Sequence, residues 1–211
     1  MTGAMSTLQT TREFIPGTTG WTADDLNDPQ IERLWEAGAY EIVEGVLTLM
    51  PPAYHDGTLP LSRLRRLIER HLDATHTPGE FTNEDDFIIA RKKVARVDLL
   101  FMTPDDHRRQ EEAHATRRRA RLRFGRIVVP PTLIVESVSL GHEDHDRETK
   151  RSWYAEARVP NYWILNAFDR SLECLKLVGD AFETDVAGRD ADELRPALFP
   201  GLLIKLADLW V

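Results

Sequence analysis

The sequence predicts a mixed α/β (α+β) domain in which a central β-sheet is flanked by helices. Three observations support this prediction. Short apolar runs of strand length recur along the chain and are bounded by polar or proline-containing turns. Between them lie segments whose apolar residues recur at helical spacing. The chain has 211 residues, a length that suits one domain with additional segments.

The first third of the chain predicts an arm, a helix, a hairpin and a longer helix. Residues 1–20 are rich in Thr and Gly and are expected to form a flexible arm, followed by a single domain over residues 21–211. A short helix is expected from about Asp24 through Trp35, with Asp24 near its N-terminus. Residues 40–50 favour two strands joined by a turn at Glu44-Gly45. A second helix is expected over residues 59–72, where Leu and Ile recur at helical spacing.

The remainder of the chain alternates further strands with one more helix. Apolar runs indicate the strands, and Gly179-Asp180 indicates the turn of a second hairpin. The expected segments are strands at 87–89, 97–102 and 132–138, a helix at 146–158, a strand at 162–165, a hairpin of 171–178 and 182–186, and a last strand at 199–204.

The composition limits the class of protein. Cys174 is the only cysteine, so the chain can form no internal disulfide or zinc site with paired cysteines. A reducing cytoplasm is therefore the expected location. No stretch approaches the roughly 20 apolar residues of a membrane span. The 27 Lys and Arg against 35 Asp and Glu give a net charge of -8, which argues against an unspecialised nucleic-acid coat.

The positive charge is concentrated in an Arg-rich insertion, residues 107–126. It contains eight Arg and only two acids, a net charge of +6. Such a run favours a charged surface helix. The alternative is an arm that contacts DNA through Arg117, Arg118, Arg119, Arg121 and Arg123.

Two carboxylates fall inside segments that otherwise resemble core strands. Side chains alternate across a strand, so Asp98 is expected to share a face with Leu100, and Glu136 with Ile134. An ionised carboxylate among apolar neighbours is costly unless it is paired, hydrogen-bonded or bound to a metal. Either acid alone could be structural, in an ion pair or at a strand end. The two together predict a functional site.

Lys150 supplies the third candidate group. It is one of five lysines and follows Asp146 by four residues on the expected helix, with Tyr154 one turn further. The alternative is an ordinary surface ion pair with Asp146. Asp98, Glu136 and Lys150 together favour metal-assisted phosphodiester hydrolysis, with Mg²⁺ (or Mn²⁺) held by carboxylates and the lysine acting on water or phosphate.

Five segments of the chain carry a resemblance to a known family. From Tyr40 to Leu206 the chain resembles the Uma2 family of restriction-endonuclease-like proteins, in the PD-(D/E)XK nuclease superfamily. The segments are YEIVEGVL (40–47), RVDLLF (96–101), LIVESVS (133–139), VPNYWI (159–164) and FPGL (199–202), together with Met50-Pro51-Pro52, His55, Asp146, Lys150 and Tyr154.

The resemblance implies a restriction-endonuclease-like core and a metal-dependent endodeoxyribonuclease. It implies that Asp98, Glu136, Glu41 and the carbonyl of Ser137 hold the metal, and that Lys150 is the catalytic lysine. The simple superfamily pattern would have lysine at position 138, which here is Val138. His55, Asp146 and Tyr154 are implied as supporting residues.

Two departures from the family pattern supply no ligands. Val97 and Leu140 stand where the family usually has proline. By analogy with nucleases that cut two strands, a homodimer acting on DNA is expected.

Two rival interpretations remain. The first is a catalytically inactive nuclease-like fold that serves as a DNA-binding or protein-interaction module. The second is a transition-metal site in the cluster His142, Glu143, Asp144, His145 and Asp146, a segment that reads mainly as the loop before the Lys150 helix.

Overall fold

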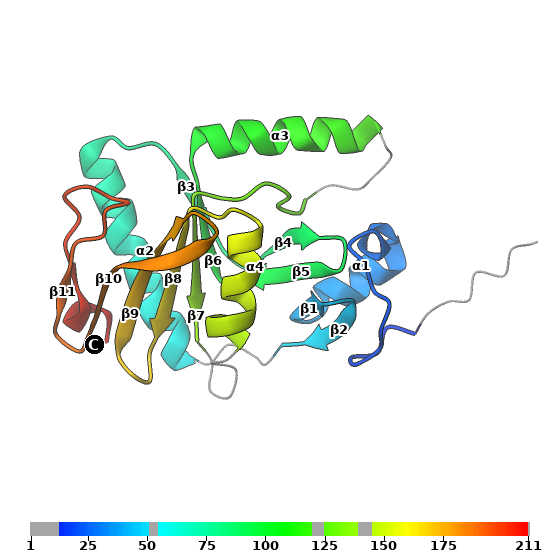
Figure 1. The fold of residues 1–211 in the computed structure, drawn as a ribbon, viewed down its shortest axis with the longest axis horizontal. Coiled ribbons are helices and arrows are strands. Elements are labelled where there is room, and N and C mark those ends of the chain that lie inside the picture. The colour runs from blue at the N-terminus through cyan, green and yellow to red at the C-terminus, as the bar shows by residue number, and fades with distance from the viewer. Residues whose placement is uncertain (1–12, 51–54, 120–124, 139–144, 211) are drawn as a thin grey trace, which may run out of the picture.

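A computed structural model describes the backbone of residues 13–50, 55–119, 125–138 and 145–210, and the side chains of 13–50, 58–116, 125–138 and 147–210. Two β-sheets lie side by side and are flanked by helices (Figure 1). The predicted mixed α/β (α+β) class is confirmed. No helix in these described ranges is long and apolar enough to cross a membrane.

The smaller sheet contains the predicted N-terminal hairpin. Its order is β2-β1-β5-β4, with all neighbours antiparallel. Glu44 and Gly45 have φ angles of 49° and 83°, the left-handed backbone that a tight hairpin turn requires. A short 3-10 helix and α1 pack against this sheet through a cluster that includes Trp21 and Trp35. The bounds are η1 Asp25–Asn27, α1 Pro29–Glu36, β1 Tyr40–Val43, β2 Val46–Leu49, β4 Asp85–Ala90 and β5 Lys93–Val97.

The larger sheet has the order β10-β9-β8-β7-β6-β3. Only β7 and β8 pair in parallel among its described strands, and the chain crosses between them through a π-helical segment, η2, and α4. The bounds are β3 Glu80–Thr82, β6 Leu99–Met102, β7 Leu133–Ser137, η2 His145–Lys150, α4 Arg151–Glu156, β8 Asn161–Asn166, β9 Ser171–Val178 and β10 Ala181–Arg189. Beyond it lie β11 Glu193–Leu194, β12 Ile204–Lys205 and η3 Leu206–Leu209.

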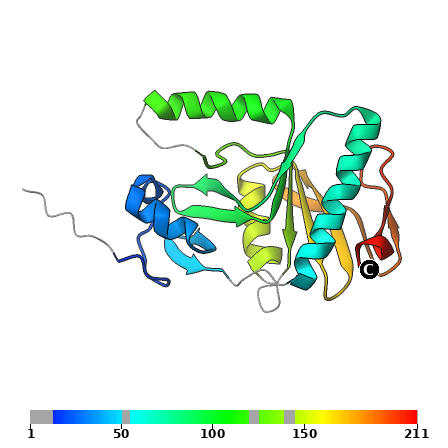
Figure 2. The same ribbon diagram turned by 180° about the vertical axis from the view of Figure 1, so that it is seen from behind.

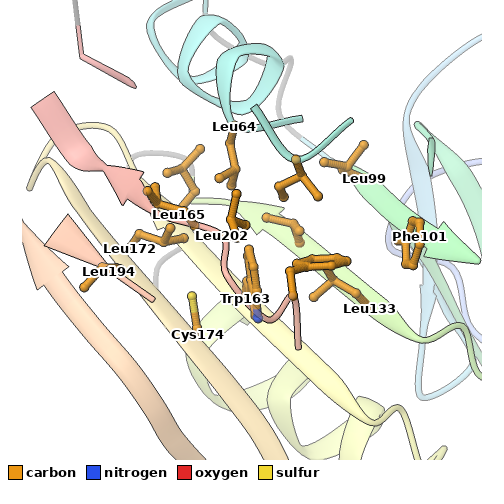
Figure 3. Packing of buried hydrophobic residues seen from close by; sticks show 14 of the residues in the cluster. Leu64, Leu99, Phe101, Leu133, Trp163, Leu165, Leu172, Cys174, Leu194 and Leu202 are labelled. Carbon is orange, nitrogen blue, oxygen red and sulfur yellow. The ribbon is translucent and has the colours of Figure 1, made fainter. Parts of the chain in front are cut away.

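Two helices cover opposite faces of the larger sheet. Figure 1 shows α4 in front of the strands and α2 (His55–Thr75) behind them, and Figure 2 shows the reverse view. Leu64 of α2 packs into a core with Trp163, Leu165 and Leu172 (Figure 3). Ile134 belongs instead to the core on the α4 side. Alternation along β7 therefore places Glu136, two residues after Ile134, on the face covered by α4.

The structure corrects three boundaries. The expected strand 97–102 is broken at Asp98, where the chain bends from β5 of the smaller sheet to β6 of the larger one. The last strand is shorter than expected, because only Ile204–Lys205 pairs with another strand. The helix expected at 59–72 extends over His55–Thr75.

The Arg-rich insertion begins as a helix. This helix, α3, spans Pro104–Arg119 and starts at a capping box, in which the Thr103 and Asp106 side chains each accept the backbone N–H of the other residue. Gln110, one turn further, donates to the Arg126 carbonyl and accepts from the N–H of Val128. A polar stripe, rather than an apolar face, therefore attaches α3 to the protein.

Candidate active site

Three buried ionisable side chains from different parts of the fold meet at one point. Glu41 of β1 is 0% exposed, Glu136 of β7 is 1% exposed and Lys150 of η2 is 4% exposed. The Lys150 Nζ lies 3.0 Å from Glu41 Oε1 and 3.2 Å from Glu136 Oε1. The alternative of an ordinary surface lysine is therefore wrong for Lys150. The two sheets and the β7–β8 crossover each contribute one group to this constellation.

Asp98 adjoins the same constellation from the bend between the sheets. Its carboxylate Oδ2 accepts the backbone N–H of Ser137 at 2.7 Å, next in the chain to Glu136. The expected strand position of Asp98 was wrong because the chain must change direction there to leave one sheet and enter the other. The bend nevertheless holds Asp98 beside the end of β7.

Tyr154 holds the Glu136 carboxylate from α4. Its side chain is fully buried, and its hydroxyl donates to Glu136 Oε1, the oxygen that also contacts Lys150. Burial and the neighbouring Glu136 carboxylate raise the pKa of Tyr154 well above its ordinary value of 10.0, whereas Lys150 opposes this shift. Tyr154 therefore stays protonated and remains a donor at neutral pH.

The backbone of Arg96 forms hydrogen bonds with both Glu41 and Lys150. Its N–H donates to Glu41 Oε1 at 3.2 Å, and its carbonyl oxygen accepts from the Lys150 Nζ at 3.5 Å. No sequence pattern predicts this role of Arg96, because it depends on the pairing of β1 with β5 rather than on the arginine side chain.

A second buried network lies on the other side of β5. The Asp86 carboxylate accepts from the Trp35 indole, the Arg96 guanidinium and the Arg126 guanidinium at 2.6, 3.2 and 3.1 Å. Burial raises the pKa of Asp86, and the positive charges of Arg96 and Arg126 partly offset it. The surface-helix interpretation expected the whole Arg-rich insertion to be exposed to solvent. Arg126, its last residue, is only 9% exposed, so this expectation is wrong for that residue.

For the other predicted site residues the structure describes only the backbone or nothing. His55 is the first residue of α2 and Asp146 lies in η2, but their side chains are outside the described set. The same holds for Arg117–Arg119 at the end of α3. Arg121, Arg123 and residues 142–144 of the His-rich cluster lie outside the described residues altogether.

Helix α3 lies far from the end of β7 that carries Glu136. In Figures 1 and 2, α3 runs along one edge of the molecule, whereas the carboxyl end of β7 and the first turn of α2 point towards the opposite edge. Helix α3 is therefore at the opposite end of the larger sheet's strands from the carboxyl end of β7, which carries Glu136.

The residues present fit a hard divalent cation in donor type and charge. In residues whose side chains are described, no group of three or more His, Cys, Asp or Glu is arranged to hold a metal ion. Mg²⁺, however, needs only one or two protein carboxylates and takes its other ligands from water and phosphate. Asp98 and Glu136 offer such a pair, since a hydrogen bond joins Asp98 to the N–H that follows Glu136. Three carboxylates against one ammonium also leave this constellation formally negative.

Comparisons with known proteins agree with this fold. A family model described as "Uma2: Putative restriction endonuclease" matches residues 29–207. The structure is also similar to the crystal structure of a "putative nuclease belonging to DUF820" from Anabaena variabilis, with a TM-score of 0.62 and 14% sequence identity. That similarity covers 82% of this chain and 90% of the other chain, and it shows a shared fold. A comparison with curated proteins finds no match.

Proposed function

Because the chain belongs to the Uma2 family, we propose that it is a metal-dependent endonuclease that hydrolyses DNA phosphodiester bonds. The observation that carries this proposal is the meeting of Glu41, Glu136 and Lys150 beside Asp98. Burying two carboxylates and an ammonium is costly, and such constellations are concentrated at catalytic sites.

Asp98 and Glu136 would hold Mg²⁺ or Mn²⁺, with Glu41 and the Ser137 carbonyl oxygen completing the protein ligands. The bound metal supplies positive charge that stabilises the phosphorane-like transition state and promotes ionisation of water. Tyr154 fixes the carboxylate of Glu136 by its hydrogen bond. The Arg96 N–H does the same for Glu41.

Lys150 orients the attacking water or neutralises the phosphate through its ammonium donors. The water gives up a proton as its oxygen bonds to phosphorus, the P–O ester bond breaks, and the leaving oxygen takes up a proton, so that no net proton is needed for the ester to become a phosphate monoester and a hydroxyl. The position of Lys150 supports this role, because its Nζ lies between the two glutamates and its carbon chain is buried.

Plasmid nicking with Mg²⁺ or Mn²⁺ tests the proposal. We expect cleavage by the unaltered chain and its loss in Asp98→Ala, Glu136→Gln and Lys150→Ala. Lys205→Ala is the matched control, because the Lys205 side chain is 55% exposed and pairs with an exposed acid, Glu193. Cleavage that persists in Asp98→Ala or Lys150→Ala would reject the assignment.

A second candidate function rests on the end of α3, where Arg117, Arg118 and Arg119 follow one another. A catalytically inactive fold that binds DNA or a protein partner would use this end. It predicts salt-dependent DNA binding that survives Asp98→Ala and falls when the three arginines are neutralised.

Cleavage of both strands by a chain with one site requires a second copy or a second event. We therefore propose a homodimer as the species that makes double-strand breaks. Light scattering of the protein with and without duplex DNA measures its stoichiometry.

A further inference from the structure

Three arginines share the outward face of α2. Leu64 and Ile68 of this helix point into the core against β7 and β8. Arg63, Arg66 and Arg70 lie three and four residues apart, so they form a row on the side turned away from that core. The row borders a surface hollow of about 180 Å³, lined by Arg63, Arg66, Leu67, Arg70, Asp208 and Leu209.

Contacts within the protein hold the Arg63 and Arg66 side chains of this row. The Arg63 Nη1 donates to the Leu209 carbonyl oxygen at 2.9 Å, which ties α2 to η3. Arg66 Nε donates to the Ser62 carbonyl at 3.4 Å. A guanidinium has five N–H donors, so each of these contacts leaves donors that can reach a ligand. Arg65 differs, because it is paired with Glu69 at 2.7 Å.

The row suits a series of phosphates better than a single anion. A helix rises about 1.5 Å per residue, so the row from Arg63 to Arg70 is roughly 10 Å long. One strand of B-DNA carries a phosphate about every 3.4 Å along its axis, so a row of that length can contact more than one phosphate of a duplex. Arginine also binds phosphate oxygens through two donors at once.

The direction of α2 connects this row to the candidate active site. The first turn of α2 lies at the edge towards which β7 carries Glu136 (Figures 1 and 2). A duplex entering the site at that edge could continue along the outward face of α2. The end of α3 lies along the opposite edge, so it is less well placed to hold the same duplex.

We propose that Arg63, Arg66 and Arg70 form a docking surface for the phosphate backbone of duplex DNA. This inference rests on the proposed function, because it assigns the substrate-holding surface of that nuclease. Asp208 is the one acid of the hollow, and it lowers the affinity of the surface for a polyanion.

The experiment measures binding separately from cleavage. Fluorescence anisotropy of a labelled duplex is recorded in EDTA over a series of salt concentrations, using the full chain. The test variant is Arg66→Gln/Arg70→Gln, which leaves the Arg63–Leu209 contact intact. Arg33→Gln/Arg195→Gln is the matched control, because both arginines are exposed, both lie outside α2, and the two substitutions change the net charge equally.

Losing two phosphate contacts should reduce the slope of log K against log salt by about 1.8. If the unaltered chain and the Arg66→Gln/Arg70→Gln variant bind DNA equally near 1 M salt, this change of slope predicts roughly 60-fold weaker binding by the variant near 0.1 M salt. The control should change affinity less than about threefold with an unchanged slope. Asp208→Asn should tighten binding more than Asp180→Asn. Asp208 lines the hollow beside the three arginines, whereas Asp180 lies on the β9–β10 turn and its side chain is 99% exposed.

Each outcome bears on one proposal or both. If the unaltered chain cleaves DNA and the Arg66/Arg70 variant binds like the control, the docking surface is rejected and the nuclease stands. If binding depends on Arg66 and Arg70 but no cleavage occurs with Mg²⁺ or Mn²⁺, the surface stands and the nuclease is rejected. If the unaltered chain does not bind duplex DNA, both are rejected. Circular dichroism and thermal unfolding verify that the variants remain folded.

Discussion

Replacing Lys150 by Met removes the ammonium that lies between Glu41 and Glu136. The two carboxylates, 0% and 1% exposed, would then face each other without that positive charge. Removing one partner of a buried ion pair costs about 3–5 kcal/mol, because the remaining charge is left uncompensated. Methionine keeps the length of the side chain, so little of the loss would come from packing.

Thermal unfolding measures this loss. For a domain of this size, 1 kcal/mol changes Tm by roughly 2–4 °C, so Lys150→Met should lower Tm by about 6–20 °C in EDTA. Lys205→Met is the control, since its pair with Glu193 is 3.6 Å long and about half exposed. Exposed pairs contribute about 0–1 kcal/mol, so the control should lose at most about 4 °C.

Divalent metal adds a second arm to this experiment. If Glu41 and Glu136 can share a metal, Mn²⁺ should raise the Tm of Lys150→Met more than that of the unaltered chain, because it supplies the missing positive charge. An equal Tm loss in Lys150→Met and Lys205→Met would refute the buried-pair reasoning. A Tm of Lys150→Met that does not rise with Mn²⁺ would refute metal binding by these glutamates.

Three further predictions concern other parts of the structure. Tyr154→Phe removes the hydroxyl donor to Glu136 and should lower the free energy of unfolding by about 1.5–3 kcal/mol, measured by urea titration; no change would contradict the hydrogen bond. Burial raises the pKa of Asp86, so the folded chain holds the proton of this carboxyl more tightly than the unfolded chain does, and the contribution of Asp86 to stability should fall as pH rises above the ordinary value of 3.8; Asp86→Asn should remove that part of the pH dependence. Gly45→Ala should cost about 1–2 kcal/mol, because Gly45 has φ 83°, and calorimetry that finds equal Tm values would exclude this strain.

Periodicity and turn chemistry predicted much of the fold. The β1–β2 hairpin follows from an alternating run interrupted by Glu44-Gly45, and both residues adopt the expected left-handed backbone. Alternation along β7 correctly placed Glu136 on the face of Ile134 and Val138. These features depend on residues close in the chain, which is why a single sequence is sufficient to find them.

The rest depends on which distant segments pair. Asp98 was expected inside one strand, but the bend there results from the chain changing sheets, which local hydrophobicity does not reveal. The contact between Arg96 and Glu41 requires the register of β1 against β5. The Asp86–Arg126 pair joins residues 40 positions apart, and the charge run around Arg126 concealed that this arginine is buried.

The β7–β8 crossover also has a consequence for the order of synthesis. Glu41 leaves the ribosome early, whereas Lys150 lies in a segment that is fixed only when β8, ending at Asn166, pairs beside β7. Because chains are made from the N-terminus, the three buried groups cannot assemble on a nascent chain that lacks β8. A reaction that depends on all three groups would therefore be absent from nascent or truncated chains that end before β8.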